Sequence, residues 1–170
     1  MIVGEAQANP DIVSGTMIVF GTFARVLFDS GPSRSFVNSS FALHVYRELS
    51  PLKHKLVVTT PLEEQIIYTL VFKGWEILIE SVVLKANLIP LEMWNFDVIL
   101  GMDWLFTHRA SVDYFTNKVV FLKPGFTKLE FEGDRRILPT CVISALEVKR
   151  LLHKGCKAYL THVIDASTSK

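Results

Sequence analysis

The stretch Ala24-Arg25-Val26-Leu27-Phe28-Asp29-Ser30-Gly31 decides the fold of this chain. A predicted apolar strand ends in an Asp, and a hydroxyl residue and a Gly follow it before a polar turn. The Gly lets the backbone turn sharply and approach a ligand closely, and the hydroxyl can hydrogen-bond to backbone and hold the carboxylate still. The tripeptide alone is weak, because a chain of this length carries one by chance on the order of one time in ten. An Asp and a Gly can also simply start a surface turn.

A second stretch, Phe96-Asp97-Val98-Ile99-Leu100-Gly101-Met102-Asp103-Trp104-Leu105, is predicted to form a buried strand, a Gly turn and the start of a helix. Together with the first stretch and the Ser35-Phe36-Val37 that follows it, this pattern resembles the retropepsin-like domain of plant gypsy-type LTR retrotransposon polyproteins. The resemblance runs from about Asp11 to about Asp165. It includes a flap-side strand at Val57-Val58-Thr59-Thr60-Pro61-Leu62, late strands at 109–113 and 118–121, and a segment at 143–160 like the one that joins protease to reverse transcriptase.

Many short strands with frequent turn signals indicate an all-β domain. The resemblance implies a mostly β, retropepsin-like acid-protease β-barrel with one or two short helices. We predict a flexible lead-in at 1–10, a retropepsin-like domain at 11–138 and a C-terminal linker toward a following polyprotein domain at 139–170. The boundary falls near Leu138-Pro139, because an amphipathic helix pattern replaces the strand pattern at 142–154 and ends at Gly155.

The expected elements follow the apolar periodicity. Strands are predicted at 12–20, 23–28, 55–60, 65–72, 75–84, 96–100, 111–114, 118–122 and 128–131, with helices at 37–48 and 102–107. Asp103 is expected to cap the second of these helices, and Asp113 to be exposed.

One Asp-Ser-Gly and no internal repeat suggest how the chemistry is assembled. An aspartic peptidase needs two carboxylates facing one water, and like charges about 3 Å apart share one proton. A single chain supplies one such Asp, so two chains must meet with Asp29 on a two-fold axis. Retropepsins are homodimers, so the resemblance implies the same. The predicted function is an aspartic endopeptidase that cleaves peptide bonds of its own polyprotein.

The resemblance also implies roles for the residues around Asp29, the predicted catalytic carboxylate. On this resemblance the Ser30 hydroxyl binds the loop of the other protomer, and Gly31 lies along the backbone of the substrate. Both residues are also common in ordinary turns. Thr60, Pro61 and Leu62 lie near a flap that closes over substrate, or else in an ordinary hairpin. Ile99, Leu100 and Gly101 pack behind the active-site loop in a structural role.

Two residues depart from the family pattern. The family commonly has Ala or Ser after Asp-Ser-Gly, whereas Pro32 follows here; Pro lacks an N–H and restricts the residue before it. The family also commonly has Gly after Thr-Pro-Leu, whereas Glu63 follows here and resists the conformation of a flap tip. The alternative function is therefore a catalytically impaired dimerisation or peptide-binding module on the same fold. A small-molecule-binding barrel has no support beyond the number of strands.

The composition limits the other classes of function. Of 170 residues, 49% are apolar and 21% charged, which leaves apolar surface for a partner. No apolar run reaches the roughly 18 residues of a membrane span. The net charge is +1 with no basic block, so neither a membrane nor direct nucleic-acid binding is expected. Cys141 and Cys156 fit no metal or redox motif, and no metal or cofactor is expected. Residues Met1 to Gln7 show no secretory signal, and we expect a cytoplasmic location in a retrotransposon particle.

Overall fold

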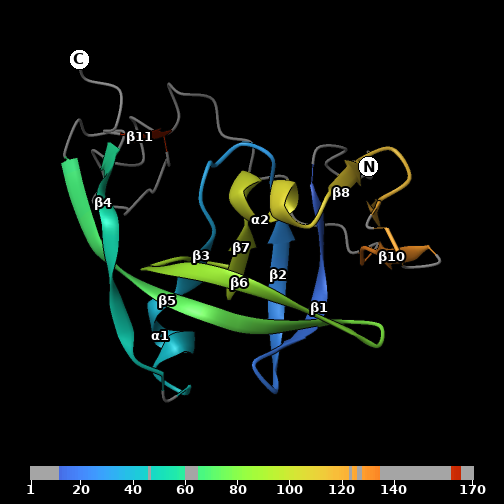
Figure 1. Cartoon of the computed structure of the whole chain (residues 1–170), viewed down its shortest axis with the longest axis horizontal. Coiled ribbons are helices and arrows are strands. Elements are labelled where there is room, and N and C mark those ends of the chain that lie inside the picture. The colour runs from blue at the N-terminus through green and yellow to red at the C-terminus, as the bar shows by residue number, and fades with distance from the viewer. Residues whose placement is uncertain are drawn as a thin grey trace, which may run out of the picture.

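The computed structural model describes residues 12–45, 47–59, 65–122, 124–125 and 128–134, and the backbone of 162–165. Within these residues the chain has eleven strands and two short helices (Figure 1). The predicted mostly β class is therefore confirmed. The predicted flap residues Thr60, Pro61 and Leu62, the neighbouring Glu63, both cysteines and the helix expected at 142–154 lie outside the described residues.

The larger sheet has eight strands in the order β1-β2-β7-β3-β6-β5-β4-β11. Strand β1 also pairs with β5, where Ile18 lies opposite Leu78. The pairings therefore close into a cycle in the order β1-β2-β7-β3-β6-β5 and back to β1. These strands are β1 (Val13–Val19), β2 (Thr22–Phe28), β3 (Phe36–Asn38), β4 (Leu49–Thr59), β5 (Gln65–Ile79), β6 (Val82–Leu91), β7 (Val98–Leu100) and β11 (His162–Asp165).

The β1–β2 hairpin and strand β7 explain how the first motif is placed. Burial alternates along β1, as expected for a strand with one face on the core, whereas Val26, Leu27 and Phe28 at the end of β2 are all buried. Strand β7 lies parallel to β2, with Phe28 opposite Leu100. Parallel strands covered on both faces are continuously apolar. The two apolar stretches found in the sequence therefore end side by side, next to helix α2 (Met102–Thr107) (Figure 1).

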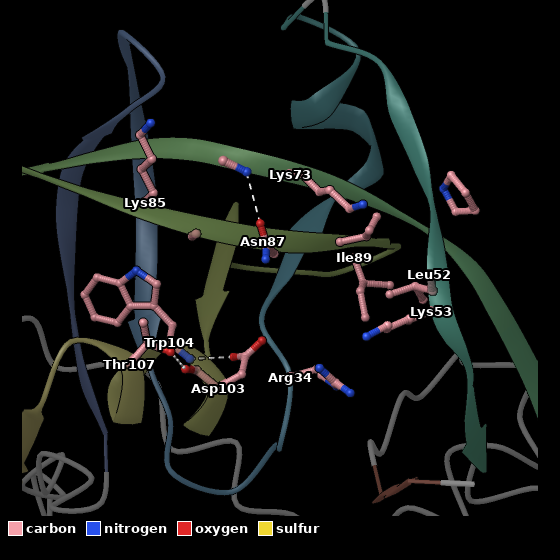
Figure 2. A pocket seen from close by; sticks show the side chains of 14 residues that line it. Arg34, Leu52, Lys53, Lys73, Lys85, Asn87, Ile89, Asp103, Trp104 and Thr107 are labelled. Carbon is pink, nitrogen blue, oxygen red and sulfur yellow. Dashed lines mark hydrogen bonds between the residues drawn. The ribbon is translucent and has the colours of Figure 1, made fainter. Parts of the chain in front are cut away.

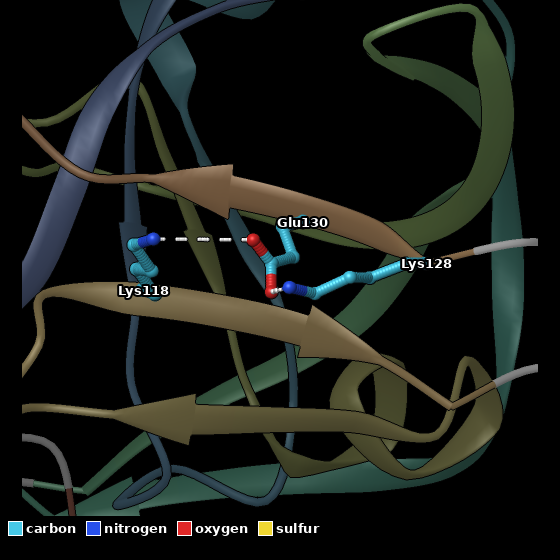
Figure 3. A network of polar contacts seen from close by, with 3 residues as sticks. All are labelled: Lys118, Lys128 and Glu130. Carbon is cyan, nitrogen blue, oxygen red and sulfur yellow. Dashed lines mark ion pairs between the residues drawn. The ribbon is translucent and has the colours of Figure 1, made fainter.

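A smaller sheet follows, with the strand order β10-β9-β8. Its strands are β8 (Ala110–Asp113), β9 (Lys118–Phe121) and β10 (Leu129–Glu132). On its surface Glu130 lies between Lys128, 2.9 Å away, and Lys118, 3.9 Å away (Figure 3). The hydrogen bond from Lys128 holds the pKa of Glu130 below its ordinary value.

The main core joins both sheets to α2, and aromatic side chains form much of it. Trp75 is fully buried against Phe72, and Trp104 of α2 contacts Phe28 of β2 and Phe121 of β9. Replacing a buried aromatic residue of this kind with Ala costs about 3–5 kcal/mol. Phe28 directly precedes Asp29 in the chain, and its ring packs in this core. The position of the predicted catalytic residue therefore depends on the core.

The helix predicted at 37–48 is wrong in extent. Phe36–Asn38 forms β3 between β7 and β6, and helix α1 covers only Ser39–Ala42. Asn38 ends the strand and caps α1, since its Oδ1 accepts a hydrogen bond from the Ser40 N–H. Burial of Phe36 and Val37 in the sheet outweighs their near-helical spacing.

The strand predicted at 75–84 is also wrong, because it spans two strands. The chain turns at Glu80, which has a φ of 52°, so that β5 runs up to Ile79 and β6 begins at Val82. Of the residues that mark turns in a sequence, this turn contains only Ser81, which is a weaker signal than Gly, Pro or Asn. Strand β11 was likewise not predicted; it pairs antiparallel with residues 56–59 of β4.

Candidate active site

Asp29 lies directly after β2, where the adjacent strand and its own loop fix its position. Its N–H donates to the Leu100 carbonyl at 3.0 Å, which extends the parallel β2–β7 pairing by one residue. The Gly31 N–H donates to Asp29 Oδ1 at 2.8 Å. Within the described residues Oδ2 has no hydrogen bond, and the residue is half-buried. The arrangement presents one oriented carboxylate with an oxygen left to meet a water or a second carboxylate.

The loop from Asp29 to Ser35 rests directly on the start of α2. The Pro32 carbonyl accepts a hydrogen bond from the Met102 N–H at 2.9 Å. A Cβ on Gly101 would overlap the carbonyl oxygens of Pro32 and Arg34. Only Gly therefore permits this backbone-to-backbone contact. The predicted position of Ile99-Leu100-Gly101 next to the active-site loop agrees with these contacts, while the role itself stays a prediction.

A buried hydroxyl connects the far end of the loop to α2. Ser35 is 1% exposed; its Oγ donates to Asp103 Oδ1 at 2.6 Å and accepts from the Gly101 N–H at 3.0 Å. Asp103 was expected to cap α2, but the N-cap is Gly101, which makes no side-chain cap bond. Asp103 lies in the first turn and accepts hydrogen bonds from the Ser35 hydroxyl and the Trp104 N–H. The sequence alone contains no signal for this pairing, because the two residues are far apart in the chain.

Ser30 is exposed, and its Oγ lies 2.9 Å from the hydroxyl oxygen of Tyr114. Tyr114 follows β8 and packs partly against the main core. The turn that carries it is held by Asp113, whose Oδ1 accepts from the N–H groups of Phe115 and Thr116. Hydrogen bonds from Thr116, the side-chain one foremost, hold the pKa of Asp113 below its ordinary value. Sequence reasoning did not identify Tyr114, since it lies 84 residues from Ser30.

A cavity of about 630 Å³ adjoins Ser30 and Tyr114. Three apolar residues of α2 line it, and two of them are unusually open to solvent: Met102 is 40% and Phe106 is 81% exposed, whereas Leu105 is buried. Exposed large apolar groups beside a functional loop are typical of an interaction surface. We call Met102 and Phe106 the α2 apolar pair.

The structure brings Asp29, Ser30, Gly31 and the 99–101 segment together. The other acidic residue at β7, Asp97, has a different setting, since its Oδ2 accepts from the Arg25 N–H at 2.8 Å and so joins β7 to β2. Among the described residues no three His, Cys, Asp or Glu side chains are grouped closely enough to hold a metal ion. Neither helix of the described part of the chain has the length and apolarity needed to cross a membrane.

The comparison with protein families agrees with this geometry. The sequence model of the family described as retroviral aspartyl protease matches residues 2–125. Because the match covers more than half of the chain, the chain belongs to that family. No curated protein matches it.

The solved structures that are similar to this chain include the following two. The retroviral protease-like domain of Ddi1 from Leishmania major aligns with a TM-score of 0.52 and 11% identity, over 74% of this chain and 98% of that domain. The EIAV protease in complex with the inhibitor HBY-793 aligns with a TM-score of 0.39 and 14% identity, over 63% of this chain and 93% of that protease. At this identity the first likeness supports the retropepsin-like fold and nothing finer.

Proposed function

We propose that this chain is an aspartic endopeptidase that works as a homodimer, in which the Asp29 carboxylates of two protomers activate one water. One carboxylate takes a proton from the water, and the other donates a hydrogen bond to the scissile carbonyl. The observation that carries the proposal is the placement of Asp29 at the end of a buried parallel strand pair, with Oδ1 held by Gly31 and Oδ2 unbonded within the described residues.

The second protomer is required by chemistry, because a lone carboxylate cannot both accept the proton of the water and donate to the carbonyl. Two features support a partner on this side of the protomer. Ser30 is exposed beside Asp29, and the α2 apolar pair lies on the same cavity as Ser30. Burying apolar groups of this kind is the usual driving force for association. The proposed role of Gly31 is to let substrate backbone approach the carboxylate.

The alternative is a dimerisation or peptide-binding module that has lost catalysis. Pro32, which departs from the family pattern, was one reason to consider it. Pro32 is buried, and its carbonyl contributes the hydrogen bond that anchors the loop to Met102. The loop therefore accommodates Pro at this position. The proposed flap role of Thr60, Pro61 and Leu62, and the effect of Glu63 beside them, rest on the sequence resemblance.

The experiment compares the purified chain with Asp29→Asn on a peptide mixture from acidic to neutral pH, with cleavage followed by mass spectrometry. We expect bell-shaped pH dependence on the acidic side, inhibition by a statine-type mimic of the tetrahedral intermediate, and loss of at least about 10³-fold in rate for Asp29→Asn. The variant is nearly isosteric, so its thermal midpoint checks that the fold is intact. Cleavage that survives in Asp29→Asn would refute the assignment. A dimer without cleavage would favour the impaired module.

We further propose that the chain belongs to a plant gypsy-type retrotransposon polyprotein, with the protease domain at 11–138, a lead-in at 1–10 and a linker at 139–170. On this proposal its substrate is the polyprotein, and it acts in a cytoplasmic particle. The motifs around Asp29 and Leu100, together with the joint-like segment at 143–160, support this assignment. Expression with the flanking polyprotein domains tests it, since an active protease releases fragments of defined mass that Asp29→Asn does not release.

A further inference from the structure

A second, larger cavity is lined by other residues of α2 than the α2 apolar pair, namely Asp103, Trp104 and Thr107. It has a volume of about 880 Å³ and is lined by β4, β5, β6, α2 and the side chain of Arg34 from the active-site loop (Figure 2). Arg34 is five residues beyond Asp29 in the chain, and its carbonyl oxygen packs on Gly101. The cavity therefore shares a wall with the loop that carries the catalytic carboxylate.

The ionisable side chains of this cavity are mostly cationic. Among the described lining residues Lys53, Lys73 and Lys85 supply three positive charges, and Asp103 supplies one negative charge. Positive charge is therefore concentrated among these described residues, in a chain whose full sequence carries a net charge of only +1. Positive charge concentrated in a concave site attracts anions and raises their local concentration.

The groups that could neutralise this charge from within are few. Asp103 already accepts hydrogen bonds from the Ser35 hydroxyl and the Trp104 N–H. Within the described residues Lys53, Lys73 and Lys85 form no ion pair, and all three are exposed. Asn87 accepts from the Gly74 N–H through Oδ1, which leaves its amide N–H groups to donate. The cavity therefore offers donors and cations to a ligand.

The walls identify the kind of anion. Figure 2 shows Lys53 and Lys73 on either side of the apolar side chains Leu52 and Ile89, with Lys85 further along β6. A surface that alternates cations with aliphatic groups suits a peptide that carries carboxylates among apolar residues. A nucleic acid would require a longer basic stripe, and the chain as a whole is near neutral.

We propose that this cavity is a recognition subsite for acidic residues of a peptide, with Lys53 and Lys73 binding the carboxylates. The inference rests on the proposed peptidase function, because it takes the ligand to be substrate. It adds a specificity that the two Asp29 carboxylates cannot supply, since they act on the peptide bond and not on side chains.

The test is a binding measurement that does not require cleavage. The full chain carrying Asp29→Asn is titrated calorimetrically with an eight-residue peptide that alternates Leu and Glu, and with its Leu and Gln counterpart. We expect the Glu peptide to bind about tenfold more tightly at low salt, as two or three screened charge pairs provide, and the preference to shrink as salt is raised. Adding Lys53→Gln and Lys73→Gln should abolish the preference. Adding Lys55→Gln, the same charge change at an exposed position of β4 outside the cavity, should leave it intact.

Equal affinity for the two peptides, absence of binding, or a preference that survives the double lysine variant would overturn the subsite. Tighter, lysine-dependent binding of a single-stranded oligonucleotide than of the Glu peptide would overturn the assignment to a peptide. Cleavage by the chain with native Asp29 is scored separately. Cleavage without a Glu preference supports the proposed peptidase and rejects the subsite. A lysine-dependent Glu preference without cleavage supports the subsite and counts against the peptidase.

Discussion

Ser35→Ala tests whether hydrogen bonds to Asp103 and Gly101 anchor the loop that carries Asp29, and the structure sets the size of the effect. The substitution removes the bond from Ser35 Oγ to the Asp103 carboxylate and leaves the N–H of Gly101 without its acceptor. A hydrogen bond to a charged group is worth about 1.5–3 kcal/mol, and an unsatisfied buried donor costs about 1–3 kcal/mol. Asp103 is half-buried and keeps its hydrogen bond from the Trp104 N–H. Water can therefore replace part of the hydrogen bond that Asp103 loses from Ser35.

The net loss is therefore about 2–4 kcal/mol, which lowers the thermal midpoint by roughly 4–16 °C for a chain of this size. Differential scanning calorimetry measures it, with Ser111→Ala as the matched control. Ser111 is exposed on β8 and its hydroxyl makes no hydrogen bond among the described residues, so its removal should change the midpoint by no more than about 2 °C. If Ser35→Ala melts like Ser111→Ala, the buried hydroxyl does not anchor the loop and the reasoning fails.

Three further perturbations concern the same region. Tyr114→Phe deletes the hydroxyl that meets Ser30 at an exposed site, and denaturant titration should show a loss of about 0.5–1 kcal/mol; no loss would mean that water replaces the contact fully. Gly101→Ala places a Cβ against backbone carbonyl oxygens and should destabilise by about 1–3 kcal/mol, so an unchanged denaturation midpoint would contradict the close packing. The lowered pKa of Asp113 means that its carboxylate stabilises the fold above its unfolded pKa, and that this stability is lost as the pH falls through the folded value. Below about pH 4 the melting temperature of Asp113→Asn should therefore fall less than that of the parent, and parallel curves from pH 5 to pH 3 would reject the role of the turn.

The features that were predictable from the sequence are those with a local physical signal. Alternation along 12–20 and the apolar stretch at 23–28 predicted the first hairpin, and an apolar run ended by Gly101 predicted β7 and α2. Asp29 stood out as a candidate site residue because it directly follows an apolar strand and precedes Ser30 and Gly31. In each case the residues that create the structure are adjacent in the chain.

The features that were missed depend on residues distant in the chain. The bond between Ser30 and Tyr114 and the bond between Ser35 and Asp103 join residues 84 and 68 positions apart, so neither pair leaves a local pattern. Phe36 and Val37 have near-helical apolar neighbours, yet pairing with β6 and β7 determines their conformation. Tertiary pairing overrides local periodicity there, as it commonly does for short segments.

The contacts of the loop bear on whether Pro32 impairs it. Backbone N–H groups hold the loop at both ends and in the middle. Asp29 donates to Leu100 and Gly31 donates to Asp29, while Met102 donates to Pro32. Gly101 and Ile89 both donate to Ser35. None of these donors belongs to residue 32, so the N–H that Pro lacks is not one that this arrangement uses. Pro also fixes its own φ, which reduces the conformational entropy of the unfolded chain wherever the folded geometry accepts it. The carboxylate of Asp29 is therefore oriented within the single protomer, and formation of the proposed dimer would require less further ordering of this loop.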